Sequence, residues 1–352
     1  MFVALRDLRA ARGRFLLITL VVTLVALLVS FLSGLTAGLA HQNISAVQSF
    51  PGDMVVFADT GGQPSFEAST LSREQVAAWQ SAAGPDGTVD PIGISHGKVD
   101  PGGRPATQVA LFGTQGTAFG NRSATENGSV VLSAGAATEL GAAAGDSVTI
   151  DGRAFTVQAV AGDDWYSHTP VVWLTLTDWQ ALDPRAGAAT VLAVSGVPDI
   201  AAVNAAARTQ TTSSSGALSA LSAYQAENGS LTLMTVLLFV ISALVIGAFF
   251  TVWTVQRMPD IATLKALGAT SGSLVRDALA QAAIVLSAGV AVGLGITVTA
   301  AAFLGDALPF VLSPATTLLP AAVLIVLGLL GAAFALRFLF TTDPLTALGA
   351  AR

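Results

Sequence analysis

Cysteine is absent from the 352 residues of this chain. Disulfide bonds, thiolate metal sites and cysteine nucleophiles are therefore excluded. A phosphate-binding loop of the form G-x-x-x-x-G-K-[ST] is absent as well, so the chain is not itself an ATP-hydrolysing domain of that type. Any energy from ATP has to come through a partner.

Charged side chains are scarce, at 11% of the chain against about 25% in soluble domains. Four segments hold none: residues 15–52, 228–256, 278–305 and 307–336. A bilayer core about 30 Å thick needs about 20 apolar helical residues, and each segment can supply them. The first is too long for the core of a signal peptide, so we expect it to remain as an anchor. The sequence predicts four transmembrane α-helices: Phe15–Ala40, Leu231–Val255, Ala278–Leu304 and Leu318–Leu336.

Lysine and arginine cluster near one set of span ends, which indicates the cytoplasmic side. They precede the first span, occupy the loop between the second and third, and follow the fourth. We therefore expect a multi-pass protein of the cell membrane with both termini cytoplasmic. The predicted segments are 1–40 (cytoplasmic N-terminus and first helix), 41–230 (extracytoplasmic domain), 231–255 (second helix), 256–277 (cytoplasmic loop), 278–304 (third helix), 305–317 (outer loop), 318–336 (fourth helix) and 337–352 (cytoplasmic tail).

The two sides of the membrane differ in charge. The cytoplasmic parts hold nine basic and four acidic residues, and the outer parts seven basic and eighteen acidic. The net charges of +5 and −11 give the overall −6. An acidic outer domain argues against nucleic acid as a partner.

We expect residues 41–230 to form a mixed α+β domain, inserted between the first and second spans. Asp53–Phe57 is predicted to be its opening strand, and Ser72–Gln75 has the capping-box pattern of a helix start. Apolar residues alternate on both sides of Asp151-Gly152, which predicts a β-hairpin. Val171–Leu174 is predicted to be a further strand, Thr177–Trp179 the start of a turn or helix, and residues 209–217 a linker returning to the membrane.

One enzyme-like pattern occurs in this domain. Gly93-Ile94-Ser95-His96-Gly97 fits G-x-S-x-G, the nucleophile elbow of hydrolases, which needs a helix directly after it. Residues 98–105 contain two prolines and two glycines and are hostile to a helix. We therefore expect a turn between strands here, no catalytic residues and no intrinsic cofactor.

The loop between the second and third spans encodes one short helix within Pro259–Thr270. Pro259 and Asp260 suit the start of a helix, by fixed φ and by the helix dipole, and Gly268 suits a left-handed stop. An apolar face then fits either a helix lying in the membrane interface or a helix docked in a groove of a cytoplasmic partner. That face consists of Ile261, Leu264 and Leu267.

This loop resembles the coupling helix of ABC permeases of the MacB/FtsX type, whose pattern is roughly basic-x-x-(E/D)-I-x-x-(L/M)-K-A-(L/I)-G-A. The order of one span, a large outer domain and three more spans is similar too, as are Ala4–Arg9 and Asp343–Leu348. The resemblance implies an ATP-driven exporter whose separate ATPase binds this helix. The residues expected to couple to that ATPase are Asp260, Ile261, Leu264, Lys265, Leu267 and Gly268.

Within that family, residues 31–45 and 224–231 resemble the hemin-exporting permeases of the HrtB type. They flank the first and second spans on the outer side. The resemblance implies that hemin is the transported substrate, extruded for heme detoxification, with Tyr224 or Glu227 as the iron ligand. The residues expected to bind hemin are Tyr224, Glu227, Asn43, His41 and Met234.

Ordinary structural roles compete with each of these assignments. Tyr224 also fits an anchor in the membrane interface, His41 a polar helix end, and Met234 a side chain facing lipid or core. Glu227 is harder to dismiss, because an acid near lipid is costly. No lysine or arginine occurs in residues 15–72 or 209–256, so the hemin propionates lack a cation nearby in sequence.

We expect a homodimer that works with two copies of a cytoplasmic ABC ATPase and releases hemin from a cleft between the protomers. Small residues of the first span would permit close helix approach; they are Ser30, Ser33, Gly34, Ala37 and Gly38. Two alternatives stay open. One is export of another amphiphile, such as a macrolide, a peptide or a lipoprotein, and the other is an FtsX-like mechanical transmitter that controls a cell-wall hydrolase.

Overall fold

The computed structural model describes residues 12–116, 118–184, 186–305 and 308–336, so the motifs Ala4–Arg9 and Asp343–Leu348 lie outside the described residues. The chain forms two compact units. One comprises Met1–Gly38 with Ser230–Arg352, and the other comprises Leu39–Gly229.

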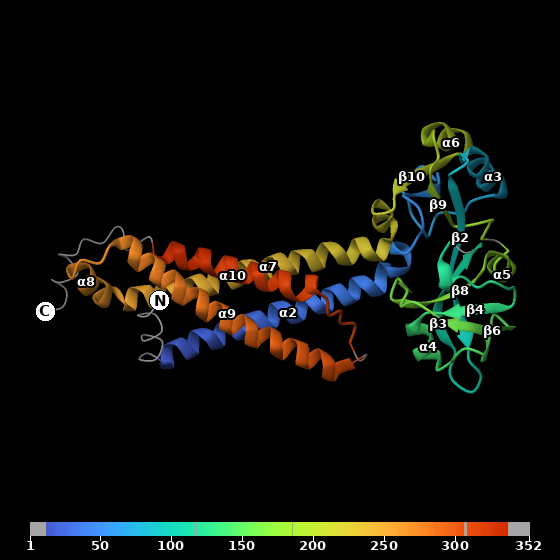
Figure 1. Ribbon diagram of the computed structural model, residues 1–352. Coiled ribbons are helices and arrows are strands. Elements are labelled where there is room, and N and C mark those ends of the chain that lie inside the picture. Colours follow the sequence, from blue (N-terminus) through green and yellow to red (C-terminus); the bar gives the residue numbers. More distant parts are fainter. Residues whose placement is uncertain (1–11, 117, 185, 306–307, 337–352) are drawn as a thin grey trace. The chain divides into compact units, whose positions relative to one another are not determined.

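The first unit is helical (Figure 1). Within the described residues, four of its helices are long and apolar enough to cross a membrane. In lipid, a helix satisfies its backbone hydrogen bonds internally, so such apolar segments fold as unbroken helices. Helix α2 continues past Ala40, and α7 begins before Leu231. The helices are α2 (Arg12–Gln48), α7 (Ser222–Gln256), α9 (Ser271–Leu304) and α10 (Pro314–Leu336), with the short α8 (Met258–Ala266) between α7 and α9.

Glycines of α9 bring it close to α2. A Cβ atom on Gly289 would lie 2.7 Å from Val22 Cγ1, and one on Gly293 would lie 2.7 Å from the Thr23 carbonyl oxygen. Two small residues spaced four apart allow helix backbones to approach closely in a membrane. The same spacing is found in Gly34 and Gly38 of α2, but with a different neighbour.

The small residues of the first span meet a loop of their own chain. A Cβ atom on Gly34 would overlap the Phe310 ring, and one on Gly38 would overlap the Pro309 carbonyl. The Val311 N–H donates a hydrogen bond to the Gly34 carbonyl at 3.2 Å. This face of α2 therefore receives the segment between α9 and α10, and our expectation of close helix approach at these two glycines was wrong.

The second unit is a mixed α+β domain around a ten-stranded sheet of order β10-β1-β9-β2-β3-β8-β4-β6-β5, with β7 paired to β8. The strands are β1 (Met54–Ala58), β2 (Thr88–Asp100), β3 (Thr107–Thr114), β4 (Ser129–Leu132), β5 (Ser147–Ile150), β6 (Arg153–Val160), β7 (Trp165–Tyr166), β8 (Thr169–Thr175), β9 (Val191–Ser195) and β10 (Thr209–Ser213). The helices are α3 (Arg73–Ala82), α4 (Ala134–Leu140), α5 (Leu176–Leu182) and α6 (Ile200–Ala207).

The long strand β2 joins the two halves of this sheet. Its first part pairs with β9 and its second part with β3. Helices α3 and α6 accompany the β1–β9–β10 half, whereas α4 and α5 accompany the other half (Figure 1). Buried Trp79 and Trp179 anchor the two respective helix-covered cores.

Several predicted elements are confirmed. Strand β1 matches the predicted opening strand, and Ser72 caps α3 in a reciprocal capping box with Gln75. The β5–β6 hairpin turns at Asp151 and Gly152, both with positive φ, as a two-residue type I′ turn requires. Thr175 is the N-cap of α5, which follows the predicted strand β8.

Two local predictions were wrong. Residues 209–217 are not a plain linker, because Thr209–Ser213 forms β10 and pairs antiparallel with β1. Its threonines are β-branched and favour an edge strand, although they are polar. Gly93–Gly97 is not a turn but part of β2. Gly93 lies in the strand because its missing side chain leaves room for the Trp179 ring.

Candidate functional site

A cluster of polar side chains surrounds Glu227 near the start of α7. His168 Nε2 lies 2.9 Å from Glu227 Oε1 and 3.0 Å from Oε2. The Asn43 side-chain amide donates a hydrogen bond of 3.2 Å to Oε2. The three residues come from α7, from the turn between β7 and β8, and from α2. This cluster holds an acidic group in place while leaving it accessible, since the Glu227 side chain is 41% exposed.

The turn that carries His168 has an unusual backbone. Ser167 and His168 have φ of 48° and 61°, the left-handed region that few non-glycine residues adopt. Two backbone hydrogen bonds fix it to α2. The Ser167 N–H donates to the Asn43 carbonyl at 3.1 Å, and the His168 N–H donates to the Gln42 carbonyl at 2.9 Å. The end of α2 thus positions the imidazole directly.

Asn43 is completely buried although its side chain is polar. Its Nδ2 donates to Glu227, but its Oδ1 has no hydrogen-bond partner among the described residues. A buried polar atom without a partner costs about 1–3 kcal/mol. The side chain is therefore held where packing alone would favour an apolar residue.

A second imidazole lies beside the same helix end. His41 Nε2 is 3.2 Å from Asp163 Oδ2, and the other oxygen of Asp163 accepts a 2.8 Å hydrogen bond from Trp165 Nε1. Trp165 is held in turn by a hydrogen bond from its backbone N–H to Ser45 Oγ at 2.8 Å. Strand β7 and the end of α2 are therefore joined by side chains as well as by backbone.

The remaining two expected hemin residues lie apart from these contacts. Tyr224 is partly buried and packs against the domain's hydrophobic core, which includes Phe66 and Leu221. Met234 is 59% exposed and belongs to the helical unit, seven residues after Glu227 in α7. The structure thus brings together Asn43 and Glu227, places His41 in a neighbouring pair, and leaves Tyr224 and Met234 outside the hydrogen-bonded cluster.

Sequence reasoning missed His168. It follows Trp165-Tyr166-Ser167 and precedes the strand residues 169–175, so it occupies a two-residue hairpin loop. The Ser167-His168 pair lacks the asparagine or glycine that is typical of such a turn. The rarity of histidine, with three in the chain, was the one available signal.

Next to this site, partly exposed Arg122 forms an ion pair with buried Asp164. Arg122 Nη1 donates to Asp164 Oδ1 at 2.9 Å, and the Asp164 side chain is 6% exposed. Burial raises the pKa of Asp164, and the neighbouring Arg122 opposes that shift. Arg122 is therefore engaged within the domain.

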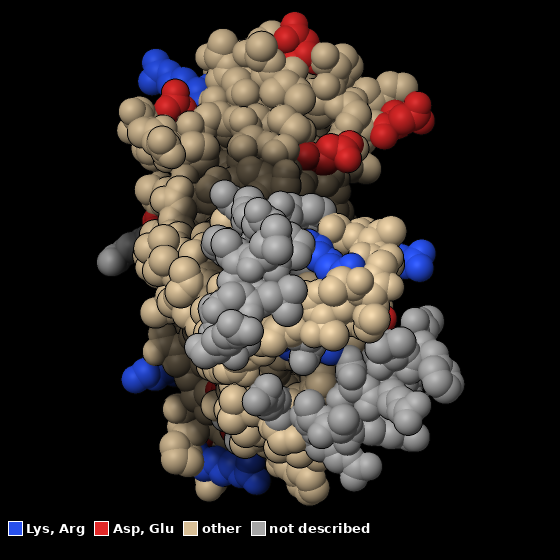
Figure 2. Space-filling model, turned by 90° about the vertical axis from the view of Figure 1, so that its left-hand side faces the viewer, with Lys and Arg blue, Asp and Glu red and all other residues tan. Residues whose placement is uncertain are grey.

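Helix α8 presents apolar side chains to its surroundings. Leu264 is 39% exposed and Leu267 is 79% exposed, while Ile261 is partly buried. Pro259 lies in the first turn, and Gly268 has φ of +94°, the predicted left-handed stop. The side chain of Asp260 is outside the described structure. Figure 2 views the molecule from the side on which Figure 1 labels α8, and blue lysine and arginine side chains are visible on the tan surface.

Arg257, just before α8, ties this end to α9. Its guanidinium donates a 2.7 Å hydrogen bond to Gln281 Oε1 and lies 5.2 Å from the centre of the Trp253 ring. Gln281 is almost fully buried and donates in turn to Asp277 Oδ2 at 3.0 Å. The start of α8 is therefore fixed to two membrane-spanning helices, so that a displacement of α8 would be transmitted to both.

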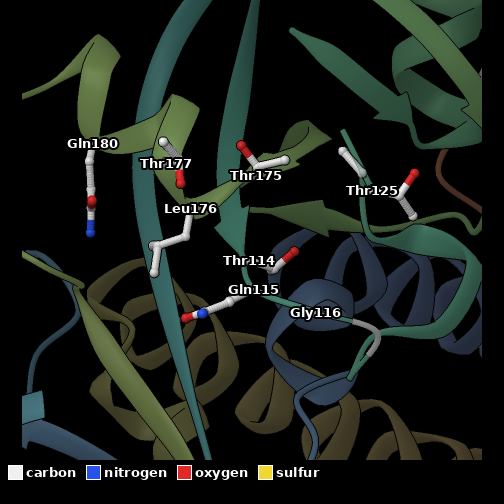
Figure 3. A pocket seen from close by; sticks show the side chains of 9 residues that line it. Thr114, Gln115, Gly116, Thr125, Thr175, Leu176, Thr177 and Gln180 are labelled. Atoms are coloured by element: carbon white, nitrogen blue, oxygen red, sulfur yellow. The ribbon is translucent and has the colours of Figure 1, made fainter. Parts of the chain in front are cut away.

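A separate pocket of about 390 Å³ opens where the parallel strands β3 and β8 end. Figure 3 shows threonine hydroxyls and glutamine amides around it. None of the residues expected to bind hemin lines this pocket, and none of its described lining residues is charged. They are Thr114, Gln115, Gly116, Ala124, Thr125, Thr175, Leu176, Thr177 and Gln180.

Ser95 of the G-x-S-x-G pattern has a structural contact. Its hydroxyl accepts a 3.0 Å hydrogen bond from Trp179 Nε1. The His96 ring lies beside that of Tyr166, with the two ring centres 5.7 Å apart. Burial lowers the pKa of His96. The pattern therefore serves strand packing around Trp179.

Two family models match this chain. The MacB-like periplasmic core domain matches residues 15–210, and the FtsX-like permease C-terminal region matches residues 232–344. Two relatives carry the name hemin transport system permease protein HrtB. The protein from Staphylococcus haemolyticus is 26% identical over 362 residues, and that from Staphylococcus epidermidis is 25% identical over 355 residues. Each alignment covers 99% of both chains.

Two solved structures are similar to part of the chain. The periplasmic region of MacB from Actinobacillus actinomycetemcomitans aligns with a TM-score of 0.37 and 14% identity, covering 50% of this chain and 94% of that one. The extracellular domain of the noncanonic ABC-type transporter YknZ from Gram-positive bacteria aligns with a TM-score of 0.35 and 11% identity, covering 46% of this chain and 100% of that one.

The two family matches together span most of the sequence and agree with four apolar helices and an α+β domain between the first two. Both concern transporter permeases, which work with an ATPase partner. The chain belongs to the MacB/FtsX-type permeases of ABC transporters.

Proposed function

We propose that this permease exports hemin from the membrane to the outside, driven by ATP hydrolysis in a separate cytoplasmic ATPase. The observation that supports this most is the cluster around Glu227, where an accessible carboxylate is held by an imidazole and a buried amide. Carboxylate oxygens can ligate ferric iron, and ligating carboxylates are themselves usually hydrogen-bonded by neighbouring residues. The names of the full-length relatives agree with this substrate.

Glu227 is the better candidate for the iron ligand, and Tyr224 is the alternative. The two residues are three apart in α7, so they share a face of the helix. Tyr224 is partly buried against the core, and a phenol in that position needs to turn outward to reach iron. The carboxylate of Glu227 needs no such movement.

In the proposed assembly, two protomers face each other and each is coupled to one ATPase copy. Helix α7 offers an apolar surface for such a cleft, because many of its large side chains are exposed in the single chain. They include Leu233, Met234, Val236, Leu237 and Val240. A flat apolar porphyrin suits walls of this kind.

Coupling to the ATPase is assigned to α8. Under the proposed orientation both termini and α8 are cytoplasmic, because lysine and arginine gather on that side. Leu264 and Leu267 would then fill an apolar groove of the ATPase. Movement of α8 would reach the membrane-spanning helices through Arg257 and Gln281.

An absorption titration with hemin tests the proposal on the purified full chain in lipid nanodiscs. The parent should develop a shifted Soret band. Glu227→Gln removes the charge at nearly constant shape and should weaken hemin binding by tenfold or more, about 1.4 kcal/mol. Glu74→Gln, a change of the same kind at an exposed position of α3, is the matched control and should behave like the parent.

The other assigned residues are compared in the same titration. Tyr224→Phe keeps the ring and removes the oxygen, while His41→Ala and Met234→Leu remove the remaining candidate donors. A parent chain that develops no Soret band would favour export of another amphiphile or an FtsX-like mechanical role. If hemin binds and all four variants match the parent, the site assignment is wrong.

A further inference from the structure

Two imidazoles at the end of α2 are each paired with a carboxylate. His41 pairs with Asp163 at 3.2 Å, and His168 pairs with Glu227 at 2.9 Å. The pairs are neighbours in the fold, because the His168 N–H donates to the carbonyl of Gln42, the residue after His41. Two of the three histidines of the chain therefore stand at one place.

Lysine and arginine are missing from the parts of α2 and α7 that lie near these two pairs. Residues 15–72 and 209–256 contain no lysine and no arginine. Arg122, which belongs to the neighbouring loop, is occupied by buried Asp164. An acidic ligand arriving here would therefore meet two imidazole rings that already face carboxylate oxygens.

Both pairs are open to exchange. The side chains of His41 and Asp163 are 35% and 58% exposed, and those of His168 and Glu227 are 33% and 41% exposed. Contacts between partly exposed polar side chains contribute little stability, because each partner is solvated almost as well apart. A carboxylate from a ligand can therefore replace Asp163 or Glu227 at small cost, and it offers each imidazole the same kind of oxygen acceptor.

We infer that His41 and His168 form a binding site for the two propionate groups of a porphyrin. The ligand's carboxylates take the places of Asp163 and Glu227 as partners of the two imidazoles. Loss of its partner leaves Glu227 free to offer an oxygen lone pair to iron, while Asn43 still donates to it and keeps it oriented. This inference rests on the proposed hemin function and adds two residues, His41 and His168, as the propionate-binding pair.

Iron-free porphyrins separate propionate binding from iron ligation. Protoporphyrin IX carries both free propionates, and its dimethyl ester carries neither charge. We expect His41→Gln and His168→Gln each to lower the affinity of the full chain for protoporphyrin IX at least fivefold, with little effect on the ester. His96→Gln, the third histidine and outside the site, is the matched control and should bind both compounds like the parent.

A third variant tests whether a propionate replaces Asp163, because it should change the affinity in the opposite direction. Asp163→Asn removes the carboxylate that competes for His41, so it should raise the affinity for protoporphyrin IX and leave the ester unchanged. Histidine variants that bind both compounds like the parent, or that lose both equally, would overturn the inference. A parent that binds hemin with a Glu227-dependent Soret band alongside such insensitive variants would leave the proposed function intact.

Discussion

His168 and Glu227 are 59 residues apart in the chain, yet the imidazole Nε2 lies within 3.0 Å of both carboxylate oxygens. The contact links the β7–β8 turn to the first turns of α7. The same turn is fixed to α2 through the carbonyls of Gln42 and Asn43. One turn therefore joins the end of α2 to the start of α7 by hydrogen bonds.

Orientation in the membrane can be checked with lysine labelling. A membrane-impermeant amine reagent applied to intact cells should modify Lys98, which is exposed in strand β2, and spare Lys265 in α8. After the cells are opened, both should react. Equal modification of the two lysines in intact cells would contradict the proposed orientation.

Coupling depends on the apolar face of α8. Leu264→Asp should abolish ATPase-driven export while hemin binding to the permease stays unchanged, because an unpaired charge in an apolar groove is costly to desolvate. Ala266→Asp places the same charge on another side of this short helix and is the control. Normal export by Leu264→Asp would show that α8 is not the docking element.

Gly93 tests the structural explanation of the hydrolase-like pattern. A Cβ atom there would overlap the Trp179 ring, so Gly93→Ala should lower the thermal stability of the outer domain by about 1–3 kcal/mol. Gly62→Ala is the control, since nothing lies near its Cβ position. Ser95→Ala should leave transport unchanged, and a loss of function with an intact fold would revive a catalytic role for Ser95.

Asp90 gives a pH-dependent prediction. Burial raises the pKa of this carboxyl group, so the folded state holds its proton more tightly than the unfolded state does. Stability should therefore decrease as the pH rises from below about 3.9, the ordinary value for aspartate, through the raised folded value. Asp90→Asn should stabilise the chain at pH 7 relative to the parent and lose that advantage at pH 3. Thermal unfolding at the two pH values measures the difference, and an equal effect at both would contradict it.

The sequence predicts the membrane helices well because lipid imposes a simple rule of length and apolarity. The β5–β6 hairpin and the capping box at Ser72 could also be predicted, since both depend on residues adjacent in sequence. Strand β10 was missed because its pairing with β1 joins segments far apart in the chain. The polar, threonine-rich sequence of β10 does not by itself predict pairing with β1.

The candidate site shows the same limit. Asn43 and Glu227 were predicted from the resemblance of the segments beside the spans to the hemin-exporting permeases. The contact between them and the involvement of His168 arise only from the fold. Likewise, the glycines of α2 looked suited to helix packing, whereas Gly34 and Gly38 receive Pro309 and Phe310. Spacing identifies a small-residue face and does not identify its neighbour.

The most direct test of the central claim is the position of the iron atom in a hemin-bound structure, located by anomalous scattering. We predict a single iron per cluster within ligand distance of a Glu227 carboxylate oxygen, with His168 moved from Glu227 onto a propionate. The account would be contradicted by iron ligated elsewhere, for example beside the pocket lined by Thr114 and Thr175, with the His168–Glu227 contact unchanged.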